Sequence, residues 1–247
     1  IGVNTGIMVI CAVVATVILG VLLAKLFKLS PDFRLIAGGS VGICGASAAL
    51  AVASVLPKSK ENEQFTLLVV VGVTVLSTIA MVTYPFGLRM LDVDNLSAGI
   101  FIGATIHDVA QVVAAGMLFG PEAGDVSTVV KLFRVALLLP VVLVISIFFG
   151  TQKSTNKLGW GSLKLIPTFL LGFVALSIVA SMKILPLVLT QQIGGLSRWM
   201  LVIAIAAAGL KTNFEELAKL GWQPVLMLVV ETLFIALLGL IFIFYIT

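Results

Sequence analysis

The feature that most constrains this chain is its succession of long apolar stretches. Hydrophobic residues make up 60% of the 247 positions, only 11% are charged, and the mean hydropathy is +1.23. About eight stretches can be marked, most of them near the ~20 residues that cross a bilayer core as a helix: 5–27, 35–56, 64–87, 96–119, 128–149, 163–182, 194–210 and 223–246. The sequence therefore predicts an integral membrane protein, with one transmembrane domain over 1–247.

The pattern within these stretches favours helices over a barrel. The runs are continuously apolar, whereas the strands of a membrane barrel alternate over about ten residues. The loops between them are short and leave no room for a sizeable water-soluble domain. We therefore expect an all-α, polytopic helical bundle in the lipid bilayer, with any chemistry inside the bundle or at its rims.

One stretch carries an unusual density of glycine. In "GGSVGICGASAALAVASVLP" (38–57), four glycines crowd the first half, and alanine, valine and leucine dominate the second. Glycine inside a helix costs roughly 1 kcal/mol relative to alanine. Two readings stay open: close helix packing through small residues, or a discontinuous helix whose second half begins near Ser47.

A second stretch, "GATIHDVAQVVAAG" (103–116), contains the chain's only histidine. Thr105 with Asp108, or Asp108 with Gln111, fits the spacing of a capping box, so a helix is expected to begin at one of these residues. Asp108 is either a structural N-cap or part of a site. His107 is either a core histidine bonded to a backbone carbonyl or a proton carrier.

A third interruption is expected in "AAAGLKTNFEELAKLG" (206–221). Gly209 can end a helix, and Thr212 with Glu215 can cap the next one. We therefore predict a helix break or end at Lys211, Thr212 and Asn213, with Lys211 at the aqueous rim.

Interrupted helices at membrane depth predict an anion site. The N-terminus of a half-helix carries free N–H donors and about half a positive charge, and two such ends meeting near the midplane are typical of secondary transporters built from repeats. The predicted substrate-binding residues are Cys44, Gly45, Ser47, Thr105, His107, Asp108 and Gln111, with a further site at Lys211, Thr212 and Asn213.

Other charged residues in or near the apolar stretches have simpler interpretations. Glu231 is expected to partner a polar group on a neighbouring helix, and Lys131 and Arg134 are expected to snorkel to the interface. With all eight stretches counted as full spans, nine Lys or Arg residues fall on one side of the membrane and six on the other, which is a weak positive-inside signal. The nine on the expected cytoplasmic side are Lys25, Lys28, Arg34, Arg89, Lys153, Lys157, Lys164, Lys211 and Lys219, and the opposite six include Lys58 and Lys60.

Several function classes are disfavoured by what the sequence lacks. Cys11 and Cys44 are too few for a thiolate metal site, and we expect neither a metal nor a cofactor. No Walker A loop, Gly-x-Ser-x-Gly elbow or His-Glu-x-x-His motif occurs, so ATP-driven transport and intramembrane catalysis are disfavoured. No basic tract with interleaved aromatics suggests nucleic acid.

The three interrupted motifs resemble a known family. "GICGASAA" (42–49), "GATIHDVAQVVAAG" and "AAAGLKTNFEEL" (206–217), in this order and before one last span, closely resemble the YeiH family of bacterial inner-membrane proteins. That family is largely uncharacterised and its members carry a sulfate-exporter label. The resemblance implies a multi-pass transporter of the bacterial plasma membrane with inverted-repeat architecture. It also implies further N-terminal hydrophobic segments that are missing here.

The function expected on these grounds is secondary transport of a small anion, of the sulfate or sulfonate type. Two alternatives stay open: a proton- or sodium-coupled cation antiporter that uses Asp108, and a transporter fragment without independent activity. An anion site needs Asp108 protonated or turned away as a cap, whereas a cation site needs it ionised and facing the cavity. Proton or sodium coupling and a homodimer also stay open.

Overall fold

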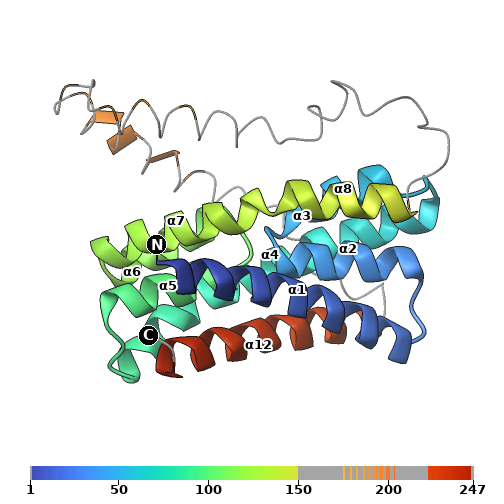
Figure 1. Cartoon of the computed structure of the whole chain (residues 1–247), viewed down its shortest axis with the longest axis horizontal. Helices are drawn as coiled ribbons and strands as arrows, with labels where there is room; N and C mark the ends of the chain where they lie inside the picture. Colours follow the sequence, from blue (N-terminus) through green and yellow to red (C-terminus); the bar gives the residue numbers. More distant parts are fainter. Residues whose placement is uncertain are drawn as a thin grey trace.

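The computed structural model describes residues 2–149 and 222–245, with scattered single positions between 175 and 203. This part of the chain forms a bundle of helices (Figure 1). Their bounds are α1 Val3–Leu26, α2 Pro31–Gly42, α3 Ala46–Val55, α4 Lys60–Met90, α5 Asn95–Thr105, α6 Val109–Phe119, α7 Pro121–Ala136, α8 Leu138–Phe149 and α12 Trp222–Tyr245. The predicted all-α class is confirmed. The stretches at 163–182 and 194–210 lie almost wholly outside the described residues.

Long helices run through the bundle from end to end. Within the described part, α1, α4 and α12 are each long and apolar enough to cross a membrane. Helices α7 and α8 follow one another along the whole bundle, and both chain termini lie at the end where α7 begins (Figure 1). The axis of these long helices is therefore the direction in which the protein crosses the bilayer.

Helices α5 and α6 form a hairpin that enters the bundle and returns to the same end. Arg89, at the end of α4, donates from Nη2 to the carbonyls of Leu118 and Phe119 at 2.7 and 3.0 Å. At the start of α5, Asn95 Nδ2 donates to Glu122 Oε2, beyond the end of α6, at 3.3 Å. The outer ends of α5 and α6 therefore lie together, and only the residues between them reach the interior.

Helices α2 and α3 form a second hairpin, which enters from the opposite end. Asn62, at the start of α4, donates to the Asp32 carboxylate at 2.6 Å and to the Pro57 carbonyl at 2.7 Å. A Cβ on Gly39 would lie 3.2 Å from the Val52 side chain, so the two arms pack against each other. Figure 1 shows this hairpin and the α5–α6 hairpin at opposite ends of the bundle.

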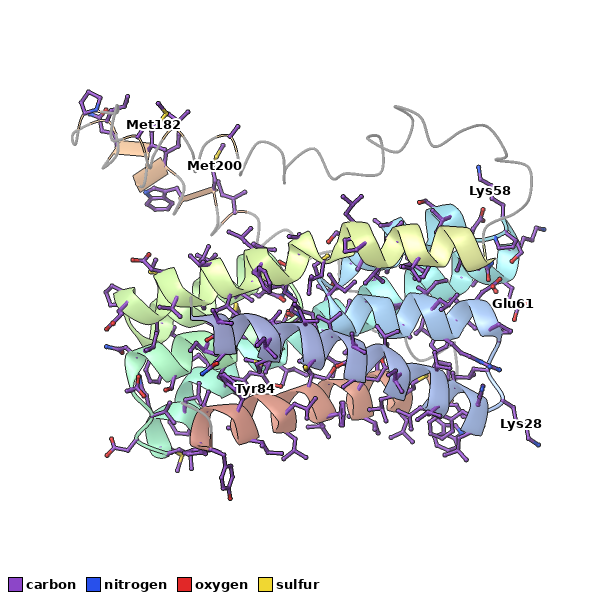
Figure 2. The ribbon with its side chains drawn as sticks, in the orientation of Figure 1. Lys28, Lys58, Glu61, Tyr84, Met182 and Met200 are labelled. Atoms are coloured by element: carbon purple, nitrogen blue, oxygen red, sulfur yellow. The ribbon has the colours of Figure 1, made fainter. Side chains whose placement is uncertain are left out.

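Both interruptions were predicted from the sequence, but the assumption that 35–56 and 96–119 are full spans, on which the expected sides of the charges depended, does not hold. Each is re-entrant, and this changes which side the later charges occupy. Lys28, Lys58 and Glu61 all lie at one end (Figure 2), so the expected placement of Lys58 and Lys60 opposite Lys28 is also wrong. Among the described residues outside the interior, five Lys or Arg lie near this end, against Arg89 alone at the other: Lys25, Lys28, Arg34, Lys58 and Lys60. By the positive-inside rule, we expect the five-cation end to face the cytoplasm.

Glycines let α7 pack closely against the α5–α6 hairpin. A Cβ on Gly99 would lie 2.7 Å from Val126 Cβ, and one on Gly103 would lie 2.8 Å from Val130 Cβ. A Cβ on Gly116 of α6 would lie 2.8 Å from Gly124 Cα. These small residues permit the close backbone approach that holds membrane helices together. They also fix α7 beside both arms of the hairpin.

Replacing Gly103 by alanine is expected to destabilise the protein by about 1–3 kcal/mol, because the new methyl group would overlap α7. The free energy of unfolding in mixed micelles measures this effect. Gly87→Ala is the matched control, since nothing lies within 4 Å of a Cβ at that helical position. Equal stability of the two variants would show that the close contact between α5 and α7 is not required.

Candidate functional site

The tips of the two hairpins meet in the interior of the bundle. The first tip is Ile43–Gly45, between α2 and α3, and the second is Ile106–Asp108, between α5 and α6. A Cβ on Gly45 would lie 3.3 Å from His107 Cβ, so the two tips are in van der Waals contact. Four helix ends therefore converge there: the C-termini of α2 and α5 and the N-termini of α3 and α6. We call this place the tip contact.

The two tips turn by different means. Gly45 has φ +66° and ψ −126°, a backbone conformation that side chains rarely permit. Its N–H donates to the Ser40 carbonyl, and the Ser40 hydroxyl donates to its carbonyl, both at 2.8 Å. The second tip is extended at Ile106 and Asp108, and the Asp108 carboxylate accepts from the Ala110 N–H at 2.8 Å. Asp108 is therefore the N-cap of α6.

Two buried cations from α7 satisfy the carbonyl ends of α2 and α5. Lys131 Nζ donates to the carbonyls of Ile43 at 2.8 Å and Ile106 at 2.9 Å, and so bridges the two tips. Arg134 donates from Nε to Gly42 at 2.7 Å and from Nη1 to Ala104 at 2.8 Å. It also donates from Nη1 to the Ile106 carbonyl and from Nη2 to the Val41 carbonyl.

The expectation that Lys131 and Arg134 snorkel to the interface is therefore wrong. They are 0% and 1% exposed, respectively. The polar sequence 121–127 suggests a loop, but it is the first part of α7, which begins at Pro121. At 1.5 Å per residue, Lys131 lies roughly 15 Å along the helix, at the depth of the tips. At that depth Lys131 and Arg134 donate to backbone carbonyls at the ends of α2 and α5, and not to water at the membrane interface.

His107 and Gln111 are held by threonines of two different helices. His107 Nε2 lies 2.9 Å from Thr232 Oγ1 of α12, and that hydroxyl donates to the Leu228 carbonyl. His107 Nε2 is therefore the donor in this pair. Gln111 Nε2 donates to Thr78 Oγ1 of α4 at 2.8 Å, which leaves Gln111 Oε1 buried without a partner among the described residues.

The capping prediction is confirmed in part. Helix α6 begins after Asp108, so the Asp108–Gln111 alternative gives the correct start. However, the Gln111 side chain bonds Thr78 and does not bond back to the Asp108 N–H, as a capping box would require. The Asp108 N–H donates instead to Ser77 Oγ of α4 at 3.1 Å. Thr105 ends α5; its hydroxyl bonds the Phe101 carbonyl at 2.7 Å, and its methyl group faces Gly239 of α12. The structure thus does not bring Thr105 to the N-termini.

Cys44 and Ser47 lie at the start of α3. Cys44 Sγ is 2.8 Å from Ser47 Oγ, and Ser47 Oγ also donates to the Cys44 carbonyl at 3.2 Å. Cys44 is buried, whereas Ser47, Asp108 and the first residues of α6 are only half-buried. The third predicted site, at Lys211, Thr212 and Asn213, lies outside the described residues.

A separate cavity of about 370 Å³ lies between α1 and α12. It is lined mainly by apolar side chains, among them Met8 and Phe242, and contains none of the predicted site residues. The tip contact is the better candidate site, because it combines polar side chains, helix termini and charge at membrane depth.

The charges at the tip contact favour an anion. The two C-terminal and two N-terminal helix ends carry opposing half charges that nearly cancel. Lys131 and Arg134 add two positive charges, and among the described residues around the tips only the Asp108 carboxylate opposes them. Three hydrogen-bond groups surround the start of α6: Ser77, Thr78 and Gln111. Re-entrant hairpins around such a polar centre define a transporter-like membrane protein.

Comparison with known proteins gives the family. The chain matches "Conserved hypothetical protein 698" over residues 1–228, and its relatives are named UPF0324 membrane proteins. The protein belongs to this family, which is the YeiH family, so the resemblance noted from the sequence motifs is confirmed. No solved structure matches the chain significantly.

Three relatives illustrate the similarity. The UPF0324 membrane protein of Chlorobaculum tepidum is 44% identical, over 96% of this chain and 66% of its own length. TauZ of Paracoccus denitrificans is 42% identical, over 90% of this chain and 68% of its own length. A Bacillus cereus relative is 33% identical, over 96% and 70%. The chain thus spans about two thirds of the length of these relatives.

Proposed function

We propose that this protein is a secondary transporter of a small anion, bound at the tip contact. One observation carries the proposal: the N-termini of α3 and α6 reach the membrane interior together, while Lys131 and Arg134 satisfy the carbonyl ends of α2 and α5. With those carbonyls occupied, the free N–H groups of the two N-termini are left to meet a ligand. Such N-termini are anion sites.

The capping role of Asp108 supports an anion over a cation. Its Oδ1 accepts a hydrogen bond from the first turn of α6, as expected of a cap. A cation bound to the same carboxylate would lie near Lys131 and Arg134, which repel it. The cation antiporter alternative is therefore less well supported by the charges around the tips.

The arrangement of the hairpins supports alternating access. The chain contains two successive units, each made of a long helix followed by a hairpin. The first is α1 with the α2–α3 hairpin, and the second is α4 with the α5–α6 hairpin, which runs in the opposite direction. We infer that they are inverted repeats. In transporters of this kind, the binding site lies near the midplane between the repeats and opens alternately to the two sides.

The substrate class we propose is an oxyanion of sulfur. Two relatives carry the name TauZ, which is taurine-related, and taurine is a small sulfonate. A sulfonate or sulfate offers three or more oxygens to backbone N–H groups, Ser47 and Gln111. The family's sulfate-exporter label points to the same chemistry.

Uptake of radiolabelled sulfate, sulfite and taurine into proteoliposomes tests this proposal. We expect saturable uptake of at least one of them, faster when the vesicles are preloaded with the same compound. Equal rates in protein-free vesicles for all three would refute the substrate class. Sodium-driven cation exchange without anion uptake would favour the antiporter alternative.

Replacing Asp108 separates its capping role from a charge role. Asparagine is also a good N-cap, so Asp108→Asn is expected to retain fold and anion uptake, whereas Asp108→Ala loses about 1 kcal/mol of stability. Thermal unfolding and uptake of the transported anion measure both effects. Loss of uptake in a stably folded Asp108→Asn variant would show that the negative charge itself is needed.

A further inference from the structure

Glu231 is a buried acid that the tip contact does not use. It lies near the middle of α12, is 0% exposed, and neither carboxyl oxygen has a hydrogen-bond partner among the described residues. The described helices therefore do not supply the polar partner that was expected for Glu231 on a neighbouring helix. An ionised carboxylate without partners is so costly in an apolar interior that the group is held as the neutral acid.

The carboxyl group occupies a space made by glycine. A Cβ on Gly20 of α1 would collide with Glu231 Oε1 and would lie 3.0 Å from Gly38 Cα of α2. Glu231 therefore lies where α1, α2 and α12 come together, and the missing side chain at position 20 accommodates it. This closely fitted place excludes water around the acid in the described conformation.

No described charge compensates Glu231. The helices packed against α12 are α1, α2, α4 and α5. Their titratable or charged residues, with those of the adjoining tips, are Cys11, Lys25, Asp32, Arg34, Cys44, Lys60, Glu61, Glu63, Tyr84, Arg89, Asp94, His107 and Asp108. None of them hydrogen-bonds the Glu231 carboxyl, whose oxygens are both unpartnered.

The absence of other ligands points to a proton rather than a metal ion. Hard cations require several oxygen ligands, and the described residues contain no group of three His, Cys, Asp or Glu side chains that could hold a metal. A single carboxyl with no further donor can accept a proton without any other ligand.

Helix α12 connects Glu231 to the candidate anion site. The next residue, Thr232, is 2.9 Å from His107 Nε2 at the second tip. A movement of α12 that admits water to Glu231 therefore also acts on the hydrogen bond between Thr232 and His107. The two sites share one rigid helix.

We propose that Glu231 carries the coupling proton of this transporter. The inference rests on the proposed function. The carboxylate takes a proton from water on one side of the membrane, crosses the closed conformation as the neutral acid, and releases the proton to water on the other side. No other group changes its covalent state.

Infrared spectroscopy of the protein in nanodiscs tests the proton site without any substrate. At neutral pH we expect the carbonyl band of a protonated carboxylic acid in the wild type. The band is expected to disappear in Glu231→Gln, which keeps the shape of the side chain, and to persist in the control Asp108→Asn. A wild-type spectrum without a band that depends on Glu231 would overturn the inference.

Proteoliposomes with a pH-sensitive dye inside test the coupling. With sulfate, sulfite or taurine gradients, the wild type is expected to change luminal pH as the compound moves. Glu231→Gln is expected to keep exchange of the compound and lose the pH change. If Glu231→Gln does not fold, Glu231→Asp takes its place, and a shifted pH dependence of coupled uptake is then expected.

The two proposals fail in different ways. An undiminished pH change in Glu231→Gln would refute the proton role and leave anion transport standing. Transport of none of the three compounds by the wild type would refute the proposed substrate class and, with it, the coupling of Glu231 to these compounds. The infrared band would then still distinguish a neutral carboxyl from an ionised one.

Discussion

Replacing Arg134 by methionine is expected to lower the free energy of unfolding by about 3–5 kcal/mol, because each buried carbonyl left without a donor costs about 1–3 kcal/mol. The guanidinium group donates to carbonyls at both helix breaks: those of Val41 and Gly42 in α2, of Ala104 in α5, and of Ile106 directly after α5. Methionine fills much of the volume but leaves these carbonyls without donors at membrane depth. Chemical unfolding in mixed micelles gives the measurement.

Arg89→Met is the matched control for this change. Arg89 also donates its guanidinium to the carbonyls of a helix end, at Leu118 and Phe119, but it is exposed. Water can replace it there, so the expected loss is below about 1 kcal/mol. Similar losses in the two variants would mean that the buried position of Arg134 adds nothing to stability.

Replacing Ser47 by aspartate is expected to reduce anion uptake by about 100-fold or more. A fixed carboxylate in the first turn of α3 would compete for the N–H groups proposed to bind the substrate. Like charges about 4 Å apart at an effective dielectric constant near 20 repel by about 4 kcal/mol, and each ~1.4 kcal/mol is tenfold in affinity. The initial rate of uptake into proteoliposomes measures the effect.

Ser54→Asp is the control on the same helix. Ser54 is exposed near the end of α3, away from the tip contact, so uptake is expected to stay near the wild-type rate. If Ser47→Asp folds normally and transports the anion as well as Ser54→Asp does, the start of α3 is not the anion site. Faster cation exchange in Ser47→Asp would favour the antiporter alternative.

The helix breaks could be predicted from sequence because their signals are local. The glycines of 38–45 and the capping spacing around Asp108 place the interruptions within a few residues of those observed. A glycine that needs φ +66° and an aspartate that caps the helix after it act through neighbouring backbone atoms. For the same reason, the apolar content alone predicts the membrane class, and no contact between distant residues is needed.

The direction of the chain after each break was not predictable in this way. Each interrupted stretch has the length of a full span, and hydropathy does not distinguish a crossing from a hairpin that returns. The hairpins are fixed by distant contacts, such as Asn62 with Asp32 and Arg89 with the end of α6. Lys58 was expected on the wrong side of the membrane because of this ambiguity.

The sequence by itself determined the membrane class, and it predicted the two breaks and a helix start at Thr105 or Asp108. Only the tertiary structure decided that Lys131 and Arg134 are buried and that Glu231 has no hydrogen-bond partner among the described residues. Arg134 reaches Val41 across 93 residues and Lys131 reaches Ile43 across 88. Whether a charge in an apolar helix faces lipid, water or an unpaired carbonyl depends on which helices pack around it, and this is a property of the assembled bundle.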